Sequence, residues 1–210
     1  MAEVEEVQKH LSQLNAQTEK TAQLSFLKGI DHLLLQDLGA AISALTEAIE
    51  RDPSFTLAYF ARSIASLRRS EAERGRPVEQ STPSTPQVRA AATGGKATTP
   101  AELPLTAPTP TRVIEYSPLT DLNQVITQAP TFAFAYYNRA NLYAKTGDVE
   151  RAKQDYTKAI ELNPLFAESY FNRGLLYYSE GKVKEGTRDL SRAGELGLYK
   201  AYSLIKRMNK

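Results

Sequence analysis

The chain has 210 residues, 41% of them hydrophobic, and a formal net charge of only +2. So small a charge gives no electrostatic reason to expect a nucleic-acid partner, and a chain without cysteine forms neither a disulfide nor a cysteine-ligated metal site. No apolar run approaches the roughly 18 residues of a membrane span, so we expect a soluble, elongated domain, with cytoplasm and periplasm both left open.

The first predicted element is a leading helix within residues 1–21. Its sequence VEEVQKHLSQLNAQ is amphipathic and charged, which is unlike a signal peptide. We interpret this helix as the remnant of a preceding repeat unit. On that interpretation the chain is a fragment of a longer repeat protein.

Three further helices, over residues 22–35, 41–53 and 57–71, are assigned by comparison with the repeat pattern of the last part of the chain, which is described below. In AISALTEAIERDP, the residues Ala41, Leu45 and Ala48 fall on one helical face, and Pro53 ends the segment. Small residues on such a face let two helices approach closely, so these segments are predicted to pack as neighbours.

The composition changes between about residue 75 and residue 113. This stretch holds seven of the eleven prolines, and no aromatic residue occurs between Phe60 and Tyr116. Too little apolar surface is present to offset the entropy of ordering, so we predict a disordered insertion. A helix is then expected from Pro118 to Gln128, because Ser117 suits an N-cap and Pro118 suits the first helical position.

The last part of the chain contains one pattern twice, with a period of 34 residues. YYNRANLYAKTGDVERAKQDYTKAIELNP begins at Tyr136, and YFNRGLLYYSEGKVKEGTRDLSRAGELG begins at Tyr170. In the first copy a helix over residues 136–145 is broken by Gly147 and followed by a second helix over residues 149–162. A fixed period of this size indicates one helix pair stacked on copies of itself.

This pattern resembles the tetratricopeptide repeat, whose mark is an aromatic, a small residue and a Tyr on the first helix, a Gly turn, then Ala, an aromatic, Ala and a closing Pro. One copy matches at every place: Tyr136, Ala140, Tyr143, Gly147, Ala152, Tyr156, Ala159 and Pro164. The next copy departs at Gly186, Leu190 and Leu198, which is expected of a terminal repeat. Over residues 40–210, outside the insertion, the layout is also similar to the C-terminal part of large bacterial tetratricopeptide repeat proteins of unassigned role.

The resemblance implies an all-α fold, an α-solenoid of about four antiparallel helix pairs. The expected units are 22–55, 56–132 with the insertion at about 75–113, 133–166, 167–198, and a capping helix at 199–210. In the cap, an apolar seam is predicted from Leu198, Ala201, Tyr202, Ile205 and Met208. Arg62, Arg139 and Arg173 recur at one place in the repeat, and we interpret them as a ladder between neighbouring units.

Catalytic patterns are missing from the sequence. The two histidines, His10 and His32, are too few for a histidine metal site or a triad, and no Gly-x-Ser-x-Gly occurs. TGGKATT at residues 93–99 lacks the first glycine and the final hydroxyl of a phosphate loop. Carboxylate pairs such as Asp189 and Glu195 are assigned to ordinary charged helix faces. We therefore expect no enzyme activity, no cofactor and no metal.

The remaining candidate is a binding surface, because the family implies that first helices line a concave groove. So many aromatics with few charges suit an apolar peptide or an amphipathic helix. The groove residues expected are Phe26, Ile30, Phe60, Ile64, Phe134, Tyr137, Asn138, Asn141, Phe171, Asn172, Leu175 and Tyr178. For each of them, simple packing between adjacent first helices stays open as the alternative. A clamp for a terminal carboxylate is not expected, because Phe26, Ile30 and Glu168 occupy places where it needs polar or cationic groups.

The sequence therefore predicts a non-catalytic scaffold that binds a protein or peptide of unknown identity. Two alternatives stay open. One is a structural module that associates with itself through its N-terminal end, and the other is a groove regulated in cis by the insertion.

Overall fold

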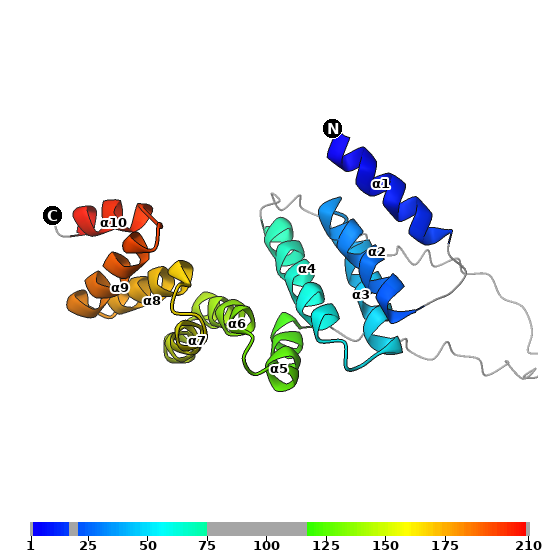
Figure 1. Cartoon of the computed structure of the whole chain (residues 1–210). Coiled ribbons are helices and arrows are strands. Elements are labelled where there is room, and N and C mark those ends of the chain that lie inside the picture. Colours follow the sequence, from blue (N-terminus) through cyan, green and yellow to red (C-terminus); the bar gives the residue numbers. More distant parts are fainter. Residues whose placement is uncertain (1, 17–20, 75–116, 209–210) are drawn as a thin grey trace, which may run out of the picture.

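The computed structural model describes residues 2–16, 21–74 and 117–208, and in these ranges it contains ten helices and no strand (Figure 1). The helices are α1 (Ala2–Asn15), α2 (Ala22–Leu34), α3 (Leu38–Arg51), α4 (Thr56–Arg74), α5 (Pro118–Gln128), α6 (Ala133–Thr146), α7 (Val149–Leu162), α8 (Ala167–Ser179), α9 (Val183–Glu195) and α10 (Lys200–Met208). None of these helices is both long and apolar enough to cross a membrane.

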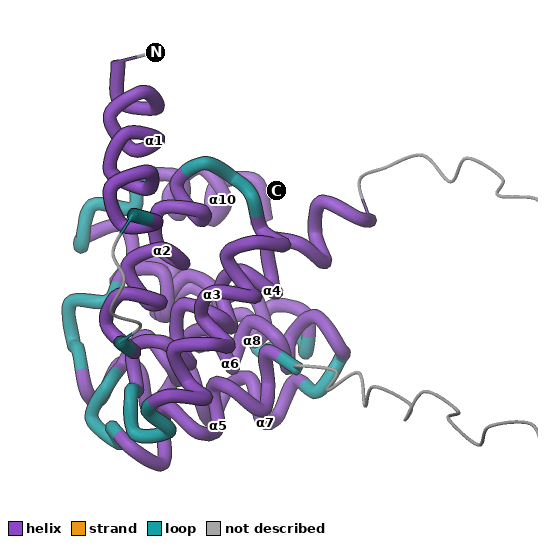
Figure 2. The backbone as a smooth tube through the Cα atoms, turned by 90° about the vertical axis from the view of Figure 1, so that its right-hand side faces the viewer, coloured by secondary structure: helices purple, strands orange, loops and turns teal. Residues whose placement is uncertain are grey.

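The helices pack as successive pairs, α2 with α3, α4 with α5, α6 with α7 and α8 with α9. Figure 1 shows the pairs following one another in a row, with α1 at one end and α10 at the other, and Figure 2 views the same row after a quarter turn. The predicted all-α solenoid of antiparallel helix pairs with a capping helix is confirmed. The residue boundaries between repeats stay a prediction, and the insertion predicted at about 75–113 lies outside the described residues.

Helix ends follow the local signals in the sequence. Gly147 ends α6 with φ of 84°, a left-handed conformation that glycine adopts without steric cost. Asp148 then caps α7 by accepting a hydrogen bond from the amide of Arg151. Ser117 is the N-cap of α5, as predicted, but its side chain makes no capping hydrogen bond, and Pro118 occupies the start of the helix.

The core lies along the seam within each pair and is built from small residues and one bulky residue per second helix. Ala41, Leu45 and Ala48 of α3 are completely buried, and Ala152 and Ala159 of α7 are too. Gly29 of α2 has no space for a side chain, since a Cβ there would lie 2.5 Å from Cγ of Leu45. The family pattern thus describes which side chains let the two helices of a pair meet.

Three arginines join the pairs to one another, which confirms the predicted ladder. Arg173 of α8 donates from Nε and Nη2 to the carboxylate of Asp189 in α9, at 2.7 and 3.0 Å. Its Nη1 donates to Oγ1 of Thr157 in the preceding pair, at 2.8 Å. Each guanidinium therefore ties its own second helix to the second helix before it.

The same three-way contact recurs in the two earlier pairs. Arg139 binds Asp155 and reaches Asn123, while Arg62 binds Asp121 and reaches Thr46. Asp189 is only 5% exposed, so the assignment of this carboxylate to an ordinary charged face was wrong. The reason is that the ladder arginine of α8 compensates the buried charge.

The capping helix α10 differs from its prediction in the exposure of two residues of the apolar seam. Ala201 is buried, and Leu198, Leu204 and Ile205 pack against the core of α8 and α9. Tyr202 covers Gly194 but stays 46% exposed, and Met208 is 42% exposed. The predicted seam is longer than the face of α9 on which α10 packs. Met208, at the end of the seam, therefore faces solvent.

Candidate protein-binding surface

All twelve predicted groove residues lie on the first helices of the pairs, α2, α4, α6 and α8. Phe134 is the most exposed of them, at 49%, and the other eleven are half-buried. Leu57, at the equivalent place in α4, is 52% exposed. The first turns of α4 and α6 thus present two large apolar side chains that the described part of the chain leaves uncovered.

A continuous row of rings runs beside these first turns. The ring centroids of Phe60 and Phe132 are 4.9 Å apart, those of Phe132 and Phe134 are 5.9 Å apart, and those of Phe134 and Phe166 are 4.9 Å apart. Phe166 continues the row to Tyr137 at 4.7 Å. We call these five residues the aromatic row. Aromatic pairs at these separations hold one another in fixed orientations, so the row is pre-ordered.

Sequence reasoning identified only three members of the row. Phe132 and Phe166 were missed, and they occupy the N-cap positions of α6 and α8. A signal was available, because Pro-x-Phe occurs at Pro130, Pro164 and also Pro53. That recurrence marks the connection between one pair and the next, where the ring is placed against the first helix that follows.

A network of amides and hydroxyls joins α6, α7 and α8 below the row. Oδ1 of Asn141 accepts hydrogen bonds from the hydroxyl of Tyr156 at 2.6 Å and from Nδ2 of Asn172 at 3.0 Å. Burial raises the pKa of the Tyr156 phenol above its ordinary range. Nδ2 of Asn138 donates to the carbonyl of Phe134. Asn141 and Asn172 therefore link α6 to α8, and the bond of Asn138 lies within α6.

A cavity of about 200 Å³ opens between α4 and α6. Its wall contains Ile64, Asn138 and Asn141, three residues expected in the groove. The remaining lining residues are Leu67, Arg68, Glu71, Leu142 and Lys145. Lys145 and Glu71 close one side with an ion pair of 3.0 Å. The lining of the cavity therefore combines three aliphatic side chains with two asparagines and three charged residues.

The other predicted residues have neighbours within the chain. Phe26 packs on Phe55, and Ile30 packs on the core of α2 and α3. In α8, Tyr178 lies over Gly186 and its hydroxyl bonds Oγ1 of Thr187, while Phe171 lies beneath the ammonium of Lys200. The predicted residues of α4 and α6 thus meet at the row and the cavity. Asn172 of α8 joins them through Asn141, whereas Phe26, Ile30, Phe171 and Tyr178 lie in other packing clusters.

The histidines take part in pairwise contacts. Nδ1 of His10 lies 2.7 Å from Oδ2 of Asp31, and Nδ1 of His32 lies 3.8 Å from Oδ2 of Asp37. Within the described residues no three histidine or carboxylate side chains are placed to share a metal ion. Neither histidine belongs to the aromatic row or the cavity.

With this geometry in view, three family models described as tetratricopeptide repeat match the chain, over residues 26–87, 133–166 and 155–186. The chain is a tetratricopeptide repeat protein. The repeat explains why a ladder arginine recurs in α4, α6 and α8 and why Pro-x-Phe recurs at the connections between pairs. A comparison with curated protein sequences finds no significant match.

Solved structures of other tetratricopeptide repeat proteins share the fold. MamA (residues 41 to end) from Desulfovibrio magneticus RS-1 superposes with a TM-score of 0.64 at 16% identity, covering 90% of this chain and 85% of its own. YrrB, described as having an unusual peptide-binding site, gives 0.65 at 11% identity, with 98% and 86% covered. The first repeat domain of Spaghetti (RPAP3), bound to an HSP90 peptide, gives 0.53 at 16% identity, with 77% and 94% covered. These neighbours share the fold, and the tetratricopeptide repeat family to which the chain belongs supports a protein-interaction scaffold.

Proposed function

We propose that this repeat protein is a non-catalytic adaptor that binds an apolar peptide or amphipathic helix of a protein partner. The observation that carries the proposal is the exposed ring of Phe134, half uncovered in the middle of an otherwise packed aromatic row. A rigid exposed ring beside a small cavity is the kind of anchor on which interface energy concentrates. Two relatives of the same fold, YrrB and Spaghetti, are described as peptide-binding or peptide-bound, which is consistent with this use of the fold.

The binding site would extend from Leu57 and Phe134 into the cavity between α4 and α6. The aliphatic side chains of its lining, Ile64, Leu67 and Leu142, suit a Leu, Ile or Met side chain of the ligand. Arg68 and the Glu71–Lys145 pair at its edge suit polar groups flanking that side chain. Because Asn138 and Asn141 already bond within the chain, they are expected to shape the wall and not to read the ligand.

Site-specific photo-crosslinking tests the proposal. A photoreactive phenylalanine placed at residue 134 should capture a partner from the source cell, and one placed at Val183 should not. Val183 is a suitable control because it is 48% exposed, close to the 49% of Phe134, but lies at the start of α9 in the turn between α8 and α9.

The captured partner would then be titrated against purified variants. Phe134→Ala should weaken binding about tenfold, as expected for the loss of one hot-spot ring, and Val183→Ala should leave affinity unchanged. Tyr137→Ala with Phe171→Ala probes the wider groove, but these rings also pack internally, so helix content must be checked. Equal affinity of Phe134→Ala and wild type would show that the binding face is elsewhere.

The same titration also tests whether the insertion regulates the groove in cis. Removal of residues 78–112 should raise affinity for the captured partner if that segment competes for the groove. Unchanged affinity would leave the adaptor function standing and remove the regulatory role.

A further inference from the structure

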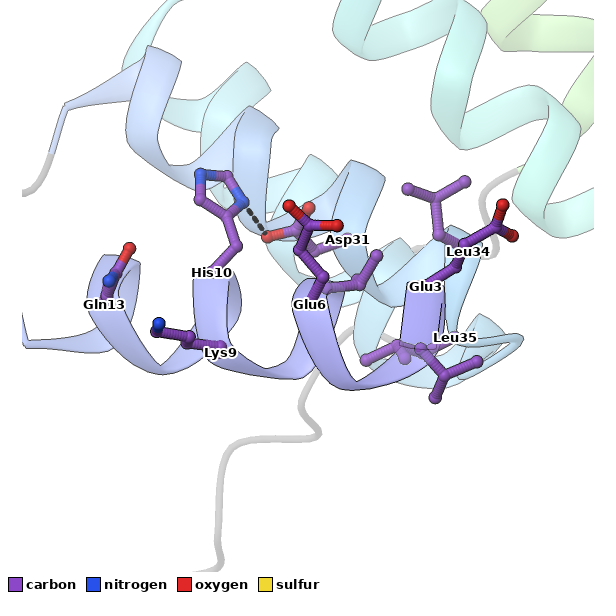
Figure 3. A pocket seen from close by; sticks show the side chains of 10 residues that line it. Glu3, Glu6, Lys9, His10, Gln13, Asp31, Leu34 and Leu35 are labelled. Atoms are coloured by element: carbon purple, nitrogen blue, oxygen red, sulfur yellow. Dashed lines mark hydrogen bonds and ion pairs between the residues drawn. The ribbon is translucent and has the colours of Figure 1, made fainter. Parts of the chain in front are cut away.

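A second surface lies far from the aromatic row, between α1 and α2. The two helices diverge and leave a cleft of about 720 Å³ (Figure 3). Its apolar part includes Val4, which is 49% exposed, and Leu34, which is 61% exposed. The cleft is lined by Glu3, Val4, Glu6, Val7, Lys9, His10, Gln13, Asp31, Leu34 and Leu35. It therefore combines uncovered apolar side chains with an excess of carboxylates.

The three carboxylates of the cleft differ in whether they already have a charged partner within the described residues. Asp31 is bonded to His10, and this contact, with the buried Leu14, holds α1 on α2. Glu3 and Glu6 form no ion pair with any residue that the structure describes. In Figure 3 their side chains project from α1 beside Leu34 and Asp31. An occupant that is apolar and positively charged would complement this surface.

The far end of the molecule offers such a surface. Tyr199, which directly precedes α10, is 75% exposed, and Tyr202 and Met208 within the helix are 46% and 42% exposed. Its last turn carries Lys206 and Arg207, and neither forms an ion pair within the described ranges. The exposed face of α10 is thus aromatic and basic, the complement of an apolar and acidic cleft.

Within one molecule the two surfaces do not meet. Figure 1 shows α1 and α10 at opposite ends of the row of helix pairs. A contact between them therefore requires two copies. Such a contact joins two different patches, and a heterologous contact of this kind builds rings or open chains and not closed two-fold dimers.

We propose that α10 of one copy docks into the α1–α2 cleft of a second copy, so that the repeats continue from one molecule to the next. Tyr199 and the part of Tyr202 that α9 leaves uncovered would fill the apolar part of the cleft, and Lys206 and Arg207 would lie against Glu3 and Glu6. The proposal is independent of peptide binding at the aromatic row, since it uses neither that row nor the adjoining cavity. Both functions can operate in the same assembly.

Light scattering on the full chain over a wide concentration range tests the proposal. The mass of the wild type should rise past that of a dimer as concentration increases, and added salt should reverse the rise because the contact includes exposed charges. Glu3→Lys with Glu6→Lys should keep the protein monomeric, and so should Lys206→Glu with Arg207→Glu. The matched control is Arg188→Glu, an exposed charge reversal on α9, which should associate like the wild type.

Mixing the two charge-reversed proteins separates a lost contact from a damaged helix end. Each protein carries one surface that complements a surface of the other, so the mixture should associate where neither does alone. An unfolded end would not be rescued in this way. Tyr199→Ala should weaken association about tenfold without loss of helix content, because Tyr199 lies just before α10 and its ring is more exposed than that of Tyr202.

A wild type that stays monomeric at high concentration would overturn the proposal and leave the cleft to a foreign basic helix. Association that survives both charge reversals, or a mixture that stays monomeric, would overturn it equally. A strict dimer insensitive to Tyr199→Ala would point to another interface.

Discussion

Arg62 in α4 donates two hydrogen bonds to the carboxylate of Asp121 in α5, from Nε at 2.9 Å and from Nη2 at 2.7 Å, although 59 positions separate them in the sequence. The two side chains are only 5% and 3% exposed. In the following pairs the same bidentate contact joins residues 16 positions apart. The arginine–aspartate contact is therefore the same whether a short or a long connection joins the two helices of a pair. It depends on how the two helices pack and not on the number of residues between them.

Asp121→Ala is expected to lower the free energy of unfolding by about 3–5 kcal/mol, because it leaves a buried guanidinium without its carboxylate. Urea denaturation followed by circular dichroism measures the loss. Replacing both partners, Arg62→Met with Asp121→Leu, should recover much of it, since no buried charge is then left uncompensated. A double variant no more stable than Asp121→Ala would contradict this explanation.

Most of the helix boundaries could be predicted from the sequence. The segments Pro118–Gln128 and Val149–Leu162 agree with α5 and α7, because proline, glycine and aspartate mark their ends directly. The arginines could be recognised since they recur, but their acceptors could not be. Asp121 and Asp189 resemble other surface carboxylates until the packing of the pairs shows them buried.

The surfaces were harder to predict than the fold. Successive side chains of a helix are rotated by about 100° around its axis, and this rotation leaves Phe134 exposed and Tyr136 buried. The sequence pattern gives the orientation of the helix only coarsely, so it does not predict the exposure of each residue. The cleft beside α1 could not be predicted at all. It lies between α1 and α2, and the contact that joins these helices, His10 with Asp31, has no counterpart in the repeat pattern.

Thr157→Val tests the contacts between successive pairs. The threonine hydroxyl accepts a hydrogen bond from Nη1 of Arg173 at 2.8 Å, and valine keeps the shape but not the acceptor. Unfolding free energy should fall by about 1–2 kcal/mol, as for a hydrogen bond to a charged group that is partly solvated. Thr127→Val is the matched control, because Thr127 is exposed and donates only to a carbonyl of its own helix. Equal losses in the two variants would argue against coupling through the ladder.

Gly186→Ala restores the residue usual in the family at this position, but it should destabilise the protein. A Cβ at this position would overlap the ring of Tyr178 and lie 3.0 Å from the carbonyl oxygen of Gly174. The cost of overpacking, about 1–3 kcal/mol, exceeds the gain of up to about 1 kcal/mol in helix propensity.

The matched variant is Gly186→Ala with Tyr178→Ala, which reproduces the combination of Ala152 and Ala144 in the preceding pair. It should unfold at a higher urea concentration than Tyr178→Ala alone, because the added methyl then fills space. If Gly186→Ala is harmful in both backgrounds to the same extent, the clash with Tyr178 is not the cause.

Tyr156 should make stability depend on alkaline pH. Burial raises the pKa of its phenol in the folded protein, while the unfolded chain keeps the ordinary pKa of about 10. Its contribution is therefore complete below pH about 10 and decreases above it, because only the unfolded chain then releases the proton, at about 1.4 kcal/mol per pH unit. Tyr156→Phe loses the hydrogen bond to Asn141 and should be less stable near neutral pH by about 0.5–1.5 kcal/mol. Urea denaturation of both proteins between neutral and strongly alkaline pH should show this difference shrinking above pH about 10, whereas a difference that stays constant would mean that Tyr156 titrates alike in both states.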